Sequence, residues 1–186
     1  MKNVPNMLCW FRIIIVPFIL LFLLESSFMT GHMVIEIRII ISLILFIIGM
    51  ISDALDGFIA RKYNVVSNFG KMFDPIADKL LVLSIMTAFI ENKYITALPI
   101  IIILAREFLI TGLRLGAMDK GTVVAANIWG KLKTVFQTTA IIIIFLTVLF
   151  NFDLIIADIA IWVVAIFTIV SAIPYFKAYS KFIFEN

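Results

Sequence analysis

The sequence has 186 residues, of which 63% are hydrophobic and 15% charged, and its mean hydropathy is +1.17. Because soluble domains usually carry about 45–50% apolar and about 25% charged residues, this composition excludes an ordinary soluble domain and a disordered chain. The net charge of +3 fits a membrane protein with basic cytoplasmic loops better than a nucleic-acid-binding protein. The single cysteine, Cys9, excludes an internal disulfide and a cysteine-based metal cluster.

The chain is therefore predicted to be an all-α, polytopic membrane protein in which residues 1–186 form one integral membrane domain. At roughly 20 residues per helical span, the length accommodates six spans with short loops and no second, soluble domain. Uninterrupted Ile, Leu and Phe runs lack the alternation of β-barrel strands, which favours helices. In chain order, the six predicted spans are residues 7–24, 33–61, 72–90, 94–118, 134–152 and 159–176.

The basic residues predict the orientation of these spans. If the N-terminus is cytoplasmic, 13 of the 15 Lys and Arg residues fall on the cytoplasmic side, and only Arg38 and Lys93 fall on the other. An excess of Lys and Arg is typical of cytoplasmic loops. Both termini are therefore expected in the cytoplasm.

Ionisable residues gather at the cytoplasmic ends of the second, third and fourth predicted spans. Each such group costs about 2.5–3.5 kcal/mol at the centre of a membrane, so it persists where it pairs, binds an ion or lines a wet cavity. Their convergence predicts a polar pocket at the cytoplasmic interface. The residues concerned are Asp53, Asp56, Arg61, Asp74, Asp78, Lys79, Arg106, Glu107 and Arg114.

Four aspartates form the centre of this predicted pocket. Asp53 and Asp56 are three residues apart, and Asp74 and Asp78 are four apart, so each pair shares a helix face. The intervening segment 62–69 is short and polar, which predicts a tight turn between antiparallel helices. All four carboxylates can then face one point.

Four neighbouring carboxylates repel one another unless positive charge lies among them. Oxygen ligands without Cys or His suit magnesium, manganese or calcium, and four of them can hold two metal ions for phosphoryl displacement. Gly57 and Ala60 are small enough to let a base or a pyrophosphate approach the backbone. Arg61 adds a guanidinium suited to phosphate. These features predict an enzyme acting on a phosphorylated substrate.

The acidic segment fits the pattern D-x2-D-G-x2-A-R-x8-G-x3-D-x3-D at every defined position, and through it the chain resembles the CDP-alcohol phosphotransferases. The resemblance covers essentially the whole chain. It implies six transmembrane helices, two divalent metal ions (magnesium or manganese), a CDP-linked lipid donor and a homodimer. The matching residues are Asp53, Asp56, Gly57, Ala60, Arg61, Gly70, Asp74 and Asp78.

The same resemblance implies individual roles. Asp53, Asp56 and Asp74 would bind one metal ion, and Asp53, Asp74 and Asp78 the other. Asp78 would also be the general base that deprotonates the acceptor alcohol, which attacks the lipid-linked phosphorus and displaces CMP. The residues expected to bind the CDP donor are Asp56, Gly57, Ala60, Arg61 and Gly70.

Four cations in the second half bear on the acceptor: Arg106, Arg114, Lys131 and Lys133. Arg106 and Arg114 lie within about 80° of each other on a helix, and such a basic cluster suits an acceptor that carries its own phosphate. The A-R-E-x5-L-R and G-K-x-K-T stretches resemble the bacterial subfamily that makes phosphatidylglycerophosphate. The acceptor implied is sn-glycerol 3-phosphate, bound through these four cations, while inositol phosphate stays open as an alternative.

Two other classes are less consistent with the sequence. Membrane prenyltransferases also use paired aspartates, but their N-D-x2-D or D-D-x2-D motifs do not occur. A divalent-cation transporter needs ionisable groups or broken helices near the membrane midplane. The outer halves of these spans are almost wholly apolar, which argues against a continuous ion path.

Overall fold

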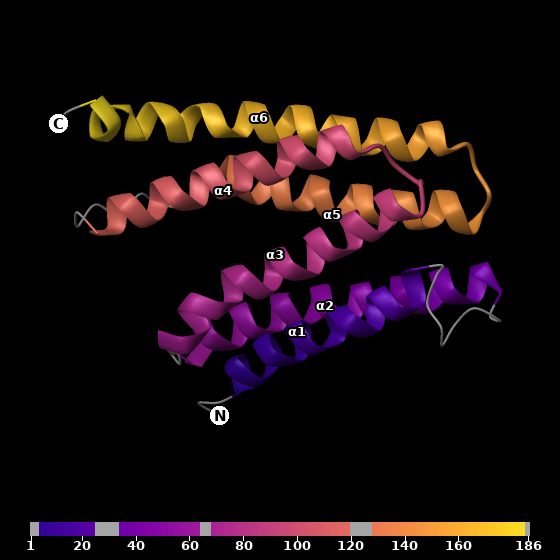
Figure 1. Ribbon diagram of the computed structural model, residues 1–186. Coiled ribbons are helices and arrows are strands. Elements are labelled where there is room, and N and C mark those ends of the chain that lie inside the picture. The colour runs from indigo at the N-terminus through magenta and orange to yellow at the C-terminus, as the bar shows by residue number, and fades with distance from the viewer. Residues whose placement is uncertain (1–3, 25–33, 64–67, 120–127, 185–186) are drawn as a thin grey trace. The chain divides into compact units, whose positions relative to one another are not determined.

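The computed structural model describes residues 4–24, 34–63, 68–119 and 128–184, with side chains described over 7–24, 34–59, 62, 76–113 and 128–175 (Figure 1). Every regular element in these residues is an α-helix, as predicted. The six helices are α1 (Val4–Leu23), α2 (Ile35–Tyr63), α3 (Asn68–Glu91), α4 (Ala97–Asp119), α5 (Ile128–Leu149) and α6 (Leu154–Phe184).

The helices begin and end differently from the predicted apolar segments. Helix α3 begins at Asn68, α5 begins at Ile128, and α6 continues to Phe184. An apolar run marks only the part of a helix at membrane depth, whereas backbone hydrogen bonding continues through polar residues. The predicted turn over 62–69 is correspondingly shorter, because α2 extends to Tyr63 and only residues 64–67 lie outside the described helices.

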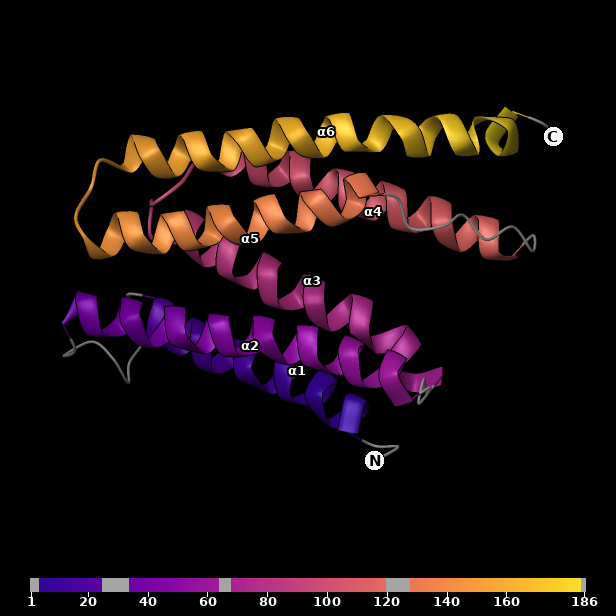
Figure 2. The same ribbon diagram turned by 180° about the vertical axis from the view of Figure 1, so that it is seen from behind.

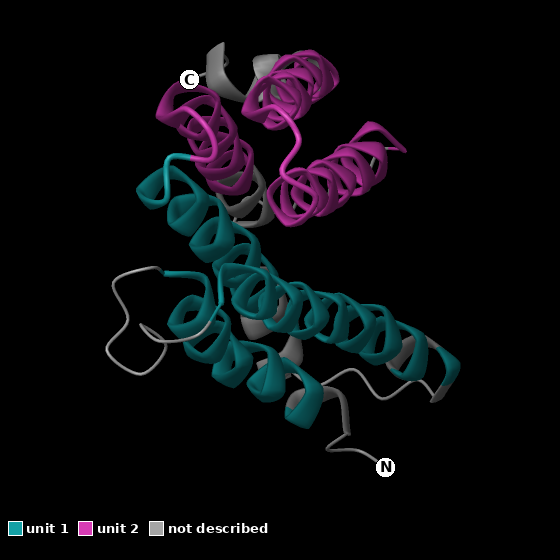
Figure 3. Cartoon of the chain, turned by 90° about the vertical axis from the view of Figure 1, so that its right-hand side faces the viewer, with its two compact units in different colours: residues 1–93 teal, residues 94–186 magenta. Residues whose placement is uncertain are grey.

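The chain divides into two compact units of three helices each, coloured separately in Figure 3. In the first, Met1–Lys93, α1 packs along both α2 and α3 (Figures 1 and 2). Ala77, Leu81, Ile85 and Phe89 recur every four residues and form the buried stripe of α3. Directly after α3, the Asn92 side chain donates a hydrogen bond to the Leu23 carbonyl oxygen at 2.7 Å. This bond connects the end of α3 to the end of α1.

The second unit, Tyr94–Asn186, has α6 packed against both α4 and α5. The buried face of α6 is rich in small residues, among them Ala157, Ala165 and Ala172, which let helices approach closely in a membrane protein. The Phe167 ring of α6 packs against the Phe136 ring of α5, with centroids 4.6 Å apart.

Three described helical stretches are long and apolar enough to cross a membrane: Ile35–Ile59, Ile128–Leu149 and Leu154–Tyr175. A fourth apolar stretch, Met7–Leu23, is shorter. The three long stretches are candidate membrane spans by their length and composition.

Gly49 of α2 lies close to the Leu81 side chain of α3, and this contact can be tested by substitution. A Cβ atom added there would lie 3.0 Å from Cδ2 of Leu81, which is fully buried. We expect Gly49→Val to overpack this contact and lower the free energy of unfolding by about 1–3 kcal/mol. Thermal unfolding in detergent measures the effect. Gly112→Val is the matched control, since a Cβ atom added there would meet nothing within 4 Å, and a destabilisation of equal size there would contradict the packing argument.

Candidate functional site

The acidic motif contacts a buried arginine of α1. Arg12 is 0% exposed, and its Nη1 lies 2.8 Å from Oδ1 of Asp53. Its Nη2 forms a short ion pair with Oδ2 of Asp56, which is buried. One guanidinium therefore binds two carboxylates of α2, and the predicted common face of Asp53 and Asp56 is confirmed.

Local sequence explains why Arg12 is buried. Cys9, Arg12, Val16, Ile19 and Leu23 are spaced three or four residues apart, and all lie on the buried stripe of α1. The two helices are also joined near the site by a hydrogen bond from Ser52 Oγ to the Leu8 carbonyl oxygen, at 3.3 Å. Arg12 is thereby held against the end of α2 that carries the aspartates.

The other residues of the motif are described to different extents. Gly57 on α2 and Asp78 on α3 are half-buried. Asp74 and Asp78 belong to the same helix, as predicted, although the side chain of Asp74 is outside the described part. The side chains of Ala60 and Arg61 are also outside it, as are the surroundings of Gly70. Among the described side chains, no three Asp, Glu, His or Cys residues form a metal centre.

The donor set of this region nevertheless fits a hard divalent cation. Asp53 and Asp56 present carboxylate oxygens beside a positively charged group, and the motif over residues 53–78 contains neither Cys nor His. Carboxylate oxygen is the ligand that magnesium and manganese prefer. The carboxylates of Asp53 and Asp56 are therefore suited to binding a divalent cation such as magnesium or manganese.

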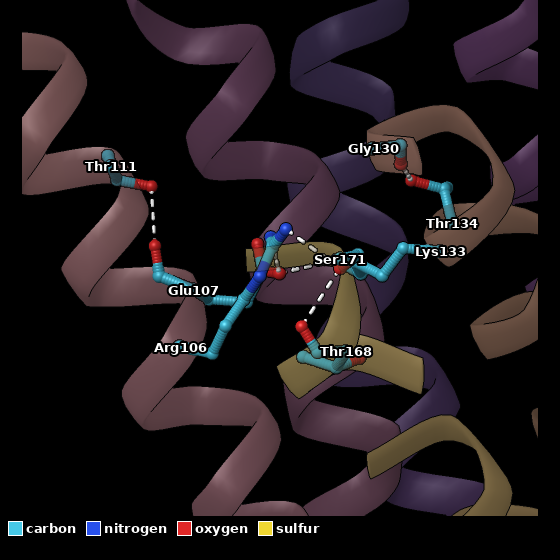
Figure 4. A network of polar contacts seen from close by, with 8 residues as sticks. All are labelled: Arg106, Glu107, Thr111, Gly130, Lys133, Thr134, Thr168 and Ser171. Atoms are coloured by element: carbon cyan, nitrogen blue, oxygen red, sulfur yellow. Dashed lines mark hydrogen bonds and ion pairs between the residues drawn. The ribbon is translucent and has the colours of Figure 1, made fainter. Parts of the chain in front are cut away.

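A second polar cluster lies in the other unit and joins α4, α5 and α6 (Figure 4). Oε1 of Glu107 is 3.1 Å from Nη1 of Arg106 and 2.5 Å from Nζ of Lys133. Nη2 of Arg106 donates a hydrogen bond to Oγ of Ser171 at 3.0 Å, and the Arg106 guanidinium lies 5.8 Å from the centroid of the Tyr175 ring. Arg106, Lys133 and Ser171 are all buried.

The helix register explains which predicted cations enter this cluster. Lys133 shares the buried face of α5 with Gln137, Ile141 and Ile144, four, eight and eleven residues further on. Lys131 is two residues from Lys133, so it points to another side of the helix, and it is exposed. The structure therefore brings Arg106 and Lys133 together but not Lys131, while the side chain of Arg114 is outside the described part.

Sequence reasoning assigned no role to two residues that the structure places in these clusters. Arg12 had a usable signal, because an arginine inside an apolar span is costly unless it has a partner. Glu107 stands in the sequence only as one of the ionisable residues of the fourth predicted span. The partner on α5, Lys133, could not be identified from sequence spacing.

The chain belongs to the CDP-alcohol phosphatidyltransferase family, whose model matches residues 2–170. It is consequently a multi-pass membrane protein of a transferase family. Its relatives include proteins named CDP-diacylglycerol–glycerol-3-phosphate 3-phosphatidyltransferase. The one from Bacillus subtilis is 40% identical over 184 residues, 95% of each chain. The one from Rickettsia typhi is 40% identical over 96% of this chain and 97% of its own. The one from Haemophilus influenzae is 31% identical over 99% and 97%.

Proposed function

We propose that this chain transfers the phosphatidyl group of CDP-diacylglycerol to sn-glycerol 3-phosphate, giving phosphatidylglycerophosphate and CMP. The observation that carries the proposal is the similarity over nearly the whole chain to relatives named for this reaction. The site agrees with it, because an acidic motif suited to a metal-bound pyrophosphate occurs with a separate cationic cluster suited to a phosphate.

The donor binds at the acidic motif in this proposal. Asp53, Asp56, Asp74 and Asp78 hold the divalent ions, and the cytidine diphosphate contacts Asp56, Gly57, Ala60, Arg61 and Gly70. When bound, the metal ions stabilise negative charge on the pyrophosphate and on the leaving group. Glycine at positions 57 and 70 and alanine at position 60 leave the backbone accessible to the donor.

The chemical step is a substitution at the lipid-linked phosphorus. Asp78 accepts the proton of the acceptor hydroxyl as the hydroxyl oxygen bonds to that phosphorus. The bond from phosphorus to the bridging oxygen of the pyrophosphate breaks, and CMP leaves. The acceptor's own phosphate is bound by the buried pair Arg106 and Lys133, with Arg114 as a further cation of the acceptor site, while the exposed Lys131 points to another side of α5.

The proposal includes six membrane-spanning helices forming one catalytic domain, with both termini and the active site cytoplasmic. The 13-to-2 distribution of Lys and Arg supports this orientation. In this arrangement α3 and α4 also cross the membrane, with their charged ends at the cytoplasmic interface. A homodimer is proposed on the family resemblance alone.

The proposal is tested by CMP release from CDP-diacylglycerol by the purified chain with magnesium or manganese. sn-Glycerol 3-phosphate, inositol phosphate and serine are supplied in parallel. We expect release with glycerol 3-phosphate only. Release with inositol phosphate instead would retain the chemistry and overturn the acceptor. No release with any of the three, from folded protein, would contradict the proposal.

A further inference from the structure

Glu107 occupies an unusual position between two cations in the second unit. A single oxygen, Oε1, is within ion-pair distance of both Arg106 on the same helix and Lys133 on α5 (Figure 4). The side chains of Arg106 and Lys133 are each 10% exposed and that of Glu107 is 12% exposed. The carboxylate therefore holds together two positive groups that would otherwise repel each other at close range.

Some polar atoms of the cluster are hydrogen-bonded, and two buried ones have no partner among the described residues. Ser171 Oγ accepts a hydrogen bond from Arg106 Nη2 and donates one to the Thr168 carbonyl oxygen at 2.8 Å. Among the described side chains, Nε of Arg106 and Oγ1 of Thr168 are buried without a hydrogen-bond partner. Because buried polar atoms are normally satisfied, these two atoms indicate that a polar ligand completes the cluster.

The charge of the cluster indicates the sign of that ligand. Among the described side chains of this cluster, two cations, Arg106 and Lys133, share one anion, Glu107, which gives an excess of one positive charge. A purely structural ion pair would need only one of the two cations. A buried guanidinium and a buried ammonium that are held side by side suit a phosphate group, which accepts hydrogen bonds from both.

We propose that Glu107 is a positioning residue that holds Arg106 and Lys133 as a preassembled cation pair for the phosphate of the acceptor. This inference rests on the proposed function. In this role, the Glu107 carboxylate fixes the distance between the Arg106 guanidinium and the Lys133 ammonium, and their orientation, before the acceptor binds. Preorganised charges bind an anion without the cost of ordering two long, flexible side chains.

The inference predicts a selective effect of Glu107→Gln on acceptor binding. The amide keeps the size of the side chain but cannot hold two cations, and loss of one member of a buried charged pair is expected to weaken binding by about tenfold or more. KM for sn-glycerol 3-phosphate should rise by this factor, while KM for CDP-diacylglycerol stays within about twofold and kcat falls less than KM rises. sn-Glycerol 3-phosphate, added without the donor, should raise the thermal unfolding midpoint of the wild type but not that of Glu107→Gln.

Control variants separate positioning from general damage. Asp158→Asn makes the same chemical change in the same unit, at a carboxylate that accepts hydrogen bonds from the backbone and side chain of Thr96, and both KM values should stay normal. Glu107→Asp keeps the charge on a shorter side chain and should raise the acceptor KM to an intermediate value. If Glu107→Gln does not fold, Glu107→Asp decides: a raised acceptor KM supports the inference and an unchanged one overturns it.

Three results with folded Glu107→Gln would overturn the inference. An unchanged acceptor KM would mean that the cations do not need the carboxylate. A lowered acceptor KM would mean that Glu107 competes with the phosphate. Equal changes in both KM values would indicate a general structural role. Wild-type protein is assayed in parallel and must release CMP with sn-glycerol 3-phosphate. If the wild type releases none, the proposed function fails, and this outcome is distinct from failure of the inference about Glu107.

Discussion

Replacement of Arg12 by glutamine is expected to destabilise the first unit by about 3–5 kcal/mol, because removing one member of a buried ion pair leaves an uncompensated charge. Arg12 is fully buried and binds both Asp53 and Asp56. Asp56, whose side chain is 6% exposed, accounts for most of this cost, since the Asp53 side chain is 39% exposed and water can solvate it. Glutamine is uncharged and cannot bind two carboxylates with one planar fork.

Thermal unfolding of the purified chain in detergent measures this loss. Arg12→Lys keeps the charge but not the fork, so its unfolding midpoint should lie between those of wild type and Arg12→Gln. Arg38→Gln is the matched control, because Nε of Arg38 donates to the Phe22 carbonyl oxygen at 3.1 Å, and a lost bond of this kind costs about 0.5–1.5 kcal/mol. Added magnesium or manganese should restore part of the stability of Arg12→Gln, because a divalent cation replaces the missing positive charge. An Arg12→Gln midpoint equal to that of wild type would show that this buried pair contributes nothing to the fold.

Arg12 also shows what the sequence could and could not predict about the fold. The number and order of the helices followed from the apolar runs, because a backbone at membrane depth must satisfy its own hydrogen bonds. Which face of each helix is buried did not follow. Lipid-facing residues are as apolar as core residues, so Phe18, which is 53% exposed, and Ile19, which is 0% exposed, look alike in the sequence. Because the buried face of α1 could not be identified from the sequence, the contact of Arg12 with α2 could not be predicted.

The candidate site was predictable where its residues are close in sequence. The spacing of Asp53 and Asp56 placed both on one helix face, and their shared contact with Arg12 agrees. The cationic cluster needed tertiary structure, because Glu107 and Lys133 are 26 residues apart on different helices. The difference between buried Lys133 and exposed Lys131 depends on the register of α5, which begins six residues before the predicted span.

Conversion of Asp78 to asparagine is expected to reduce the rate of phosphatidyl transfer by about 10²–10⁴-fold, the usual contribution of a general base. Asn is nearly the same size but cannot accept the proton of the acceptor hydroxyl. Asp78 is half-buried on α3, next to Ala77 on the buried stripe of that helix, so its substitution should change the chemistry more than the packing. The unfolding midpoint should therefore stay close to that of wild type.

The proposed metal ligation by Asp78 gives this prediction a second measurable consequence. If Asp78 also binds a divalent ion, the variant should need a higher manganese concentration for half-maximal activity, in addition to its lower maximal rate. A base that is not a ligand would lower the rate at every metal concentration without shifting that midpoint. Glu91→Gln removes an exposed carboxylate from the end of the same helix and should change neither quantity. Wild-type rates in folded Asp78→Asn would remove Asp78 from the reaction and require another group to accept the proton.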